Sequence, residues 1–90
     1  MKEFEVSFTK EAWREYQFFL NTNKKTAERI VLLVEAIAVD PFNGIGKPEP
    51  LKYKYHGYWS RRVDNENRLM YRFIDSQTIE IVRCKGHYYD

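Results

Sequence analysis

The sequence predicts an α+β fold with an N-terminal strand, two helices and then an antiparallel sheet. Residues 4–8 alternate apolar and polar side chains, which is the period of a strand buried on one face. Residues 12–39 carry apolar side chains at helical spacing, with a polar break at 21–23. Residues 51–85 form short aromatic and β-branched runs separated by turn segments, and such short connections join only antiparallel neighbours. We therefore expect helices packed on one face of a sheet.

The first strand leads directly into the first helix. Phe4, Val6 and Phe8 form the apolar face of the strand. Thr9 is suited to cap the helix, because a Thr side chain at this position accepts a hydrogen bond from the first helical turn. Phe8 and Trp13 are spaced as a hydrophobic staple, which fixes the angle at which the chain enters the helix.

The second helix is expected to cover residues 24–39, because Asp40 and Pro41 end the helical pattern there. Its apolar side chains cover more than one stripe of the helix surface, since Leu32, Ala36 and Val39 add to the main stripe. Something must cover both sides of such a helix. The pattern favours an extra interface, with a second copy of the protein or a partner segment, over a purely internal core.

Four runs that follow an irregular loop at 42–50 are expected to be strands. They cover residues 51–55, 59–63, 68–74 and 78–85. Alternation sends Arg68, Met70 and Arg72 to one face of the sheet and the residues between them to the other. In the same way Arg62 points away from Arg61.

The ninety residues are expected to form one domain, 1–90, because two separate pieces would each be too small to bury a core. Fifteen Lys and Arg against thirteen Asp and Glu give a net charge of +2, which is too weak to indicate a polyanion partner by itself. Residues 47–72, however, hold seven basic and three acidic side chains. The basic character therefore concentrates in the part of the chain that carries the arginines of the sheet.

The cysteine and histidine content limits the chemistry that the chain can use. The single cysteine, Cys84, leaves no intramolecular disulfide and no cysteine-based zinc site in a monomer. The two histidines lie far apart in sequence, so a metal site has little support, and we expect no metal and no cofactor. The sequence also has no apolar leader and no run that would span a membrane, which favours a cytoplasmic location and no membrane contact.

Three kinds of side chain could carry chemistry. Pro48 and Pro50 hold Glu49 stiffly, although a solvated loop glutamate is the plain alternative. Several arginines on one small sheet repel one another unless an anion is present, and a phosphate suits them because the planar guanidinium binds it bidentately. Surface arginines that stack on aromatic rings are the alternative there. His87 is able to donate and accept protons near neutrality, although a lone terminal histidine is usually only solvated.

Together these groups match one reaction. Cleavage of RNA without a metal needs a base for the 2′-hydroxyl proton, cations for the phosphorane and an acid for the leaving 5′-oxygen. Glu49, the arginines and His87 supply these three functions. DNA lacks the 2′-hydroxyl, so it could be bound but not cut in this way.

Four segments carry a resemblance to a known family. They are Gly46-Lys47-Pro48-Glu49-Pro50-Leu51-Lys52, Gly57-Tyr58-Trp59-Ser60-Arg61-Arg62, Asn67-Arg68-Leu69-Met70-Tyr71 and His87-Tyr88. Over essentially its whole length the chain resembles the YoeB (Txe) toxins of the RelE superfamily. The resemblance implies a RelE-like, microbial-ribonuclease-like fold and the toxin of a type II toxin-antitoxin system. It further implies a ribosome-dependent endoribonuclease, an mRNA interferase, that cleaves mRNA in the ribosomal A site and inhibits translation.

The resemblance also implies catalytic roles. Glu49 would be the general base, His87 the general acid, and Arg68 the group that stabilises the phosphate at the transition state. Tyr88 would position the nucleotide or support His87.

Binding partners follow from the same resemblance. Lys52 and Arg62 would hold the RNA backbone and neutralise its charge. The toxin would form a homodimer, in agreement with the broad apolar surface of the second helix. A YefM-like antitoxin would wrap the toxin and block or distort the site, and operator DNA would be reached only through the antitoxin complex.

A second interpretation has no catalysis. In it the basic, aromatic sheet is an RNA-binding or peptide-binding module that acts as a co-repressor with an antitoxin. Binding that depends on charge weakens as salt competes for the phosphates, so salt dependence would support this interpretation.

Overall fold

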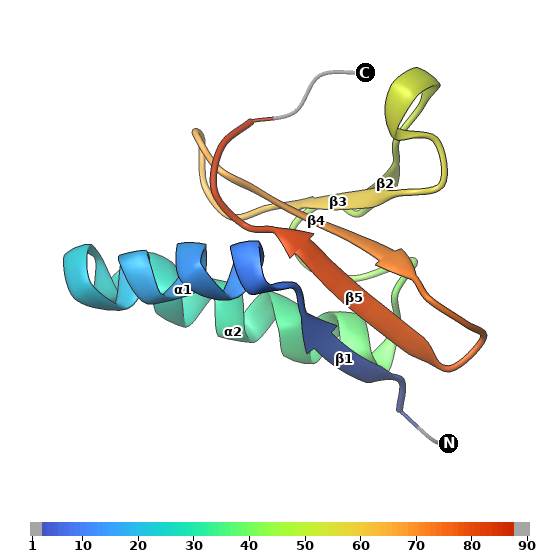
Figure 1. Ribbon diagram of the computed structural model, residues 1–90, viewed down its shortest axis with the longest axis horizontal. Coiled ribbons are helices and arrows are strands. Elements are labelled where there is room, and N and C mark those ends of the chain that lie inside the picture. The colour runs from blue at the N-terminus through green and yellow to red at the C-terminus, as the bar shows by residue number, and fades with distance from the viewer. Residues whose placement is uncertain (1–2, 88–90) are drawn as a thin grey trace.

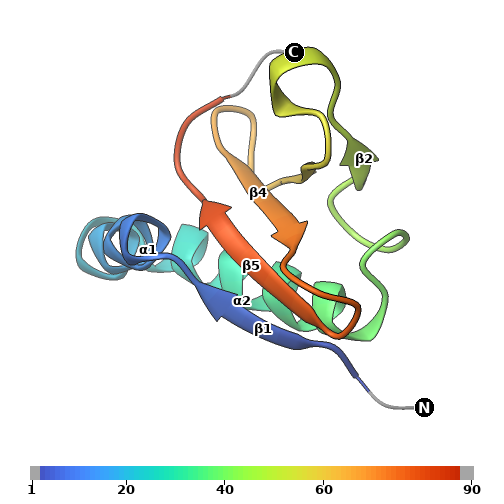
Figure 2. The same ribbon diagram turned by 45° about the vertical axis from the view of Figure 1, so that its right-hand side comes forward.

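The computed structural model describes residues 3–87 and confirms the predicted α+β fold (Figure 1). Its elements are β1 (Glu5–Phe8), α1 (Lys10–Thr22), α2 (Lys24–Val39), β2 (Glu49–Pro50), a short 3₁₀ turn η1 (Tyr53–Tyr55), β3 (Trp59–Arg62), β4 (Arg68–Phe73) and β5 (Thr78–Arg83). Both helices lie on the same side of the sheet, and η1 lies away from them (Figures 1 and 2). Neither helix among these residues is long and apolar enough to cross a membrane.

The sheet has the strand order β1-β5-β4-β3-β2. The predicted antiparallel pairing is confirmed for β3, β4 and β5. The end of the loop predicted at 42–50 is the short strand β2, which also pairs antiparallel with β3. By contrast, β1 pairs with β5 in the parallel direction, so the complete sheet is mixed. Tight turns force antiparallel neighbours, whereas almost the whole chain lies between β1 and β5 and leaves their relative direction open.

Each helix begins at a side-chain cap and ends with a backbone hydrogen bond. The Oγ1 atom of Thr9 accepts a hydrogen bond from the amide of Ala12 at 3.0 Å, which confirms the predicted cap. Asn23 separates the helices, because its amide donates to the Phe19 carbonyl at 2.7 Å while its Oδ1 accepts from the amide of Thr26 at 3.2 Å. The second helix has the predicted bounds.

One predicted strand is wrong. Residues 51–55 do not continue β2, which covers only Glu49 and Pro50. Pro50 has no amide hydrogen to donate, and Tyr53 adopts a left-handed backbone with φ of 53°, so the chain turns into η1 instead of extending. The other three strands lie within their predicted ranges and end one or two residues earlier.

The core lies between the helices and the sheet. Its fully buried side chains come from α2, β4 and β5 and include Ile30, Leu33, Ile37, Leu69, Tyr71, Ile79 and Ile81. The predicted alternation in β4 is confirmed, because Leu69 and Tyr71 belong to this core while Arg72 is exposed. We call the opposite side of the sheet the open face.

A β-bulge interrupts the pairing of β4 with β5. Tyr71 pairs with Ile81 but Met70 pairs with Arg83, so Val82 is one residue more than β4 can match. A bulge of this kind bends the strand that contains it and increases its twist. The chain therefore leaves β5 in a new direction.

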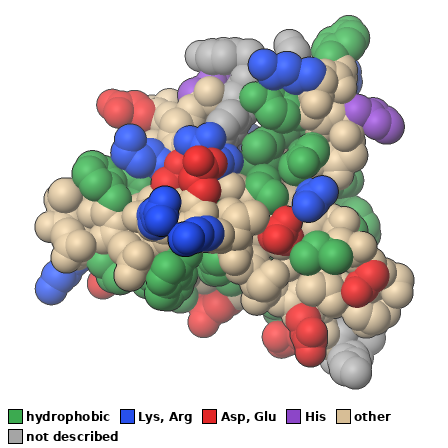
Figure 3. Space-filling view, in the orientation of Figure 1, with side chains coloured by type: hydrophobic (Ala, Val, Ile, Leu, Met, Phe, Trp, Pro, Cys, Tyr) green, Lys and Arg blue, Asp and Glu red, His purple; other side chains and the backbone are tan. Residues whose placement is uncertain are grey.

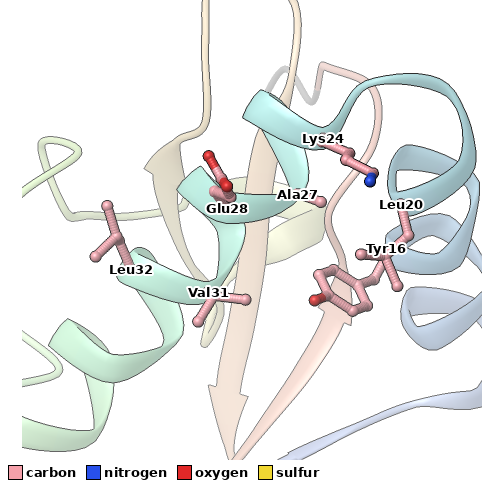
Figure 4. A pocket seen from close by; sticks show the side chains of 7 residues that line it. All are labelled: Tyr16, Leu20, Lys24, Ala27, Glu28, Val31 and Leu32. Atoms are coloured by element: carbon pink, nitrogen blue, oxygen red, sulfur yellow. The ribbon is translucent and has the colours of Figure 1, made fainter.

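Apolar side chains of α2 remain exposed, as the sequence predicts. Leu32 and Val39 are 53% and 63% exposed. A cleft of about 470 Å³ between α1 and α2 is lined by Tyr16, Leu20 and Val31 together with Leu32 (Figure 4). This surface is available for a second chain.

Candidate functional site

The loop that precedes Glu49 is organised by one buried arginine. Arg61 has no exposed surface, and it lies on the helix side of β3. Its guanidinium donates to the carbonyl oxygens of Asp40 at 2.6 Å, Asn43 at 3.0 Å and Ile45 at 3.1 Å. One of the arginines predicted for the sheet is thus an internal support of the loop and is closed to any ligand.

Tyr71 completes this support from the neighbouring strand. Its hydroxyl accepts a hydrogen bond from Nε of Arg61 at 3.2 Å and donates one to the Pro41 carbonyl at 2.7 Å. Burial raises the pKa of Tyr71, so the hydroxyl keeps the proton that it donates. The start of the loop is therefore attached to both β3 and β4.

The end of the loop is fixed by its backbone. Gly46 has φ of 84°, and a Cβ at this position would lie 2.8 Å from Cδ2 of Leu33. Its carbonyl accepts the amide of Arg62 at 2.6 Å. Lys47 also adopts a left-handed backbone, with φ of 51°. These constraints fix where the chain enters β2, and there Glu49 pairs with Ser60.

Glu49 and two arginines share the open face. Glu49 pairs with Ser60, Ser60 with Met70, and Arg62 with Arg68. Directly paired residues point to the same face, as do residues two apart on one strand. Because neighbouring strands lie about 4.8 Å apart, the backbones of Glu49 and Met70 are about 10 Å apart. A carboxylate and two guanidiniums therefore surround a patch of the open face.

The two arginines of β4 on the open face differ in their partners. Arg72 forms an ion pair with Glu80 at 3.1 Å. Arg68 is half-buried and donates from one terminal nitrogen to the carbonyls of Asp64 at 2.7 Å and Asn67 at 3.1 Å. No ion pair within 4.0 Å joins Arg68 to a carboxylate in the described part of the chain. The guanidinium of Arg68 is thus hydrogen-bonded to neutral carbonyls, and the Asp64 carboxylate acts on its charge only through space.

His87 follows a residue that is bonded twice to the point where the turn meets β4. The carbonyl of Gly86 accepts the amide of Arg68 at 2.8 Å, and its amide donates to Oδ1 of Asn67 at 2.9 Å. His87 is exposed and comes one residue later. The backbone therefore brings the predicted acid next to Arg68, while Tyr88 lies outside the described residues.

Lys52 and Arg62, which the sequence predicts to bind RNA, are both exposed. Lys52 directly precedes η1 at the edge of the sheet, and Arg62 is the last residue of β3. A hollow of about 530 Å³ on the open face has Tyr55, Tyr58 and Met70 among its lining residues. In Figure 3 hydrophobic side chains gather near η1, with Lys and Arg side chains beside them.

Sequence reasoning gave no role to Glu15 of α1, which holds the segment before His87. One carboxylate oxygen, Oε1, accepts the amides of Cys84 at 2.8 Å and Lys85 at 3.2 Å. The other, Oε2, accepts from the guanidinium of Arg83 at 2.7 Å. These partners lie about seventy residues further along the chain, so no local pattern could have found the contact.

No three His, Cys, Asp or Glu side chains come together as metal ligands would within residues 3–87. Cys84 is buried, and burial followed by the negative charge of Glu15 raises the pKa of its thiol to about 12. The thiol is therefore protonated near neutrality.

The structure is similar to solved toxins of toxin-antitoxin pairs. A YoeB/ParE toxin from Agrobacterium tumefaciens has a TM-score of 0.88 and 39% identity, covering 93% of this chain and 99% of that chain. Staphylococcus aureus YoeB has been solved as a dimer, with a TM-score of 0.85, 38% identity and coverage of 96% and 99%. The same toxin in a YoeB-YefM complex has a TM-score of 0.83 and 40% identity, covering 94% of this chain and 98% of that chain. The fold is that of a toxin of such a pair.

Comparison with known sequences identifies the family of toxins more closely. A family model described as "YoeB-like toxin of bacterial type II toxin-antitoxin system" matches residues 8–88. Toxin YoeB of Synechocystis sp. is 49% identical over 83 residues, which cover 92% of this chain and 95% of the relative. The chain belongs to the YoeB-like toxins of bacterial type II toxin-antitoxin systems, as its motifs predict.

Proposed function

We propose that this toxin is a ribosome-dependent endoribonuclease that cleaves mRNA in the ribosomal A site and so inhibits translation. The observation that carries the proposal is the placement of Glu49, Arg62 and Arg68 on one open face, with His87 attached beside Arg68. A base, two cations and an acid are the groups that cleavage at a 2′-hydroxyl requires. General acid-base catalysis by these side chains is the mechanism that we propose.

The reaction assigns one step to each group. Glu49 takes the proton of the 2′-hydroxyl, whose oxygen then attacks the adjacent phosphorus. Arg68 stabilises the negative charge that grows on the phosphorane, and His87 gives a proton to the leaving 5′-oxygen. The products are a 2′,3′-cyclic phosphate and a new 5′-hydroxyl. Tyr88 positions the nucleotide or supports His87.

The RNA backbone needs further cations, which we assign to Lys52 and Arg62. Both are exposed at the edge and end of the strands that carry the site. The open face is small, and its groups are spread across three strands. A ribosome that holds the message in the in-line geometry would supply the positioning that such a face does not provide alone.

The partners are proposed from the relatives. Staphylococcus aureus YoeB forms a dimer and a complex with YefM. We infer a homodimer and a YefM-like antitoxin for this chain, with operator DNA bound only through the antitoxin complex, and we place the protein in the cytoplasm. The exposed apolar cleft between α1 and α2 supports an interface with a second chain.

The test compares Arg68→Ala with Arg72→Ala. Both arginines belong to β4 and to the open face, but Glu80 neutralises Arg72, which serves as the matched control. Purified toxin is added to ribosomes that carry a defined mRNA, and new 5′ ends are mapped. We expect Arg68→Ala to slow cleavage by a factor of about 10²–10³ and Arg72→Ala to change it little.

Glu49→Gln and His87→Ala are expected to lower the rate by a factor of about 10²–10⁴ each. The proposal fails if the wild-type toxin produces no cuts in the A-site codon. It also fails if all of these variants cleave as the wild type does. Salt-dependent RNA binding without cleavage would favour the non-catalytic co-repressor interpretation.

A further inference from the structure

Both oxygens of the Glu15 carboxylate accept hydrogen bonds from one segment, residues 83–85. Its two oxygens accept the amides of Cys84 and Lys85 and the guanidinium of Arg83, all between 2.7 and 3.2 Å. The Glu15 side chain is only 12% exposed, whereas that of Glu11, which also pairs with Arg83, is 64% exposed. Glu15 is therefore far better shielded from solvent than its neighbour one turn earlier.

These contacts begin where the sheet ends. After Arg83 the chain leaves β5, and the amides of the next two residues turn to Glu15 instead of to a strand. The predicted strand end at Lys85 is wrong for this reason. Cys84 adds a second tie to α1, because its Sγ donates to the Ala12 carbonyl at 3.4 Å. The next residue, Gly86, is held instead by hydrogen bonds to Asn67 and Arg68, where the turn meets β4.

We propose that Glu15 is a positioning residue that fixes the Arg83–Gly86 segment and thereby places His87 for proton transfer to the leaving oxygen. This inference rests on the proposed function, since it assigns Glu15 to the step that uses the acid. The acid must come within hydrogen-bond reach of the oxygen that it protonates. Glu15 itself touches no substrate and takes part only through the backbone that it holds.

The test separates positioning of the acid from general stability. One mRNA carries an ordinary phosphodiester at the cleavage position, and a second carries sulfur in place of the bridging 5′-oxygen. A thiolate leaves without protonation, so cleavage of the second mRNA needs no acid. Rates are measured on programmed ribosomes with excess toxin for the wild type, Glu15→Ala, Glu15→Gln and His87→Ala. Glu11→Gln is the matched control, because it removes an ion pair to Arg83 but no backbone contact.

The expected result is selective for the ordinary mRNA. A displacement of about 1 Å costs about a hundredfold, so Glu15→Ala should slow ordinary cleavage by about ten- to a hundredfold. On the sulfur mRNA it should stay within about threefold of the wild type, as should His87→Ala. The double variant Glu15→Ala/His87→Ala should be no slower than His87→Ala alone, because both changes remove the same step. Glu11→Gln should match the wild type on both.

Two results overturn the inference alone. In one, His87→Ala shows the selective loss but Glu15→Ala and Glu15→Gln cleave at the wild-type rate. In the other, the Glu15 variants are slowed equally on both mRNAs, which indicates a purely structural role. If Glu15→Ala does not fold, Glu15→Gln, which keeps an oxygen acceptor but loses the charge, decides the question. Failure of the wild type to cleave either mRNA overturns the proposed function instead.

Discussion

The guanidinium of Arg61 and the hydroxyl of Tyr71 form a single buried unit, with 3.2 Å between Nε and Oη. This unit donates hydrogen bonds to four backbone carbonyls of the loop before Glu49. The positive charge of Arg61 is thus surrounded by oxygen dipoles and by the Tyr71 ring, 5.9 Å away. A loop of irregular backbone gains a fixed shape from two side chains of the sheet.

The first prediction concerns this unit. Tyr71→Phe removes the bond to the Pro41 carbonyl and leaves both that carbonyl and Nε of Arg61 without a partner. We expect the free energy of unfolding to fall by about 1–3 kcal/mol, measured by urea denaturation. Tyr16→Phe, at a half-buried position in α1, is the control and should change it by less than about 0.5 kcal/mol. Equal effects would contradict the role of the Tyr71 hydroxyl.

The second prediction compares two glycines with positive φ. A Cβ at Gly57 would meet nothing within 4 Å, so Gly57→Ala measures the backbone cost alone, about 1–2 kcal/mol. A Cβ at Gly46 would lie 2.8 Å from Leu33 and 3.1 Å from Arg61. Crowding in a packed region adds about 1–3 kcal/mol, so Gly46→Ala should be clearly the more destabilising in thermal unfolding. The reverse order would refute the close packing around Gly46.

The third prediction uses the only thiol. Because burial raises the pKa of Cys84 to about 12, very little thiolate exists at pH 8 in the folded protein. Unfolding restores an ordinary thiol, so a disulfide reagent should react about a hundredfold or more faster in urea than with the native toxin. Since Cys84 is the single cysteine, the signal has one source. Rapid labelling of the native protein would show that the thiol is not buried.

The fourth prediction concerns acid stability. Burial raises the pKa of Asp64, but hydrogen bonds from the Glu66 amide and from Asn67 outweigh it, so the pKa lies below its ordinary value. The unfolded chain therefore takes up this proton first as the pH falls. The stabilisation is complete above the unfolded pKa, about 3.9, and is lost as the pH falls through the folded pKa.

Asp64→Asn should lower the free energy of unfolding at pH 7 and make the loss of stability below about pH 4 less steep. Urea denaturation at a series of pH values measures both effects. Glu66→Gln is the control, since Glu66 is exposed and contributes its backbone amide to the turn. An unchanged slope for Asp64→Asn would show that this carboxylate does not contribute to acid unfolding.

The fold was largely predictable because its signals are local. The bounds of the second helix follow from Asn23 and Pro41, which stop helices for chemical reasons that hold in any context. The strand predicted at 51–55 failed because aromatic residues favour extended backbone on average, whereas Tyr53 turns to a positive φ here. Local hydrogen bonds form the turn instead, because the amides of Tyr55 and His56 donate to the carbonyls of Lys52 and Tyr53.

The candidate site was predictable in part. Strand alternation predicts the face on which Arg68 lies. The sequence assigns Glu49 to the irregular loop at 42–50, whereas its pairing with Ser60 of β3 puts it on the same face as Arg68. Alternation also separates Arg61 from Arg62, but it does not say which of the two enters the interior. The support that Arg61 gives to the loop and the contact of Glu15 with Cys84 depend on chain segments brought together by folding.

The bulge at Val82 makes the length of the last strand matter as much as its composition. Val82 is the unmatched residue of the bulge, so its removal would keep Arg83 opposite Met70 but take away the bend and extra twist that the bulge gives β5. The segment that Glu15 binds would then leave β5 in another direction, which would move the histidine relative to Arg68. The number of residues from Ile81 to His87, with the extra residue of the bulge included, is therefore part of the geometry that positions the histidine.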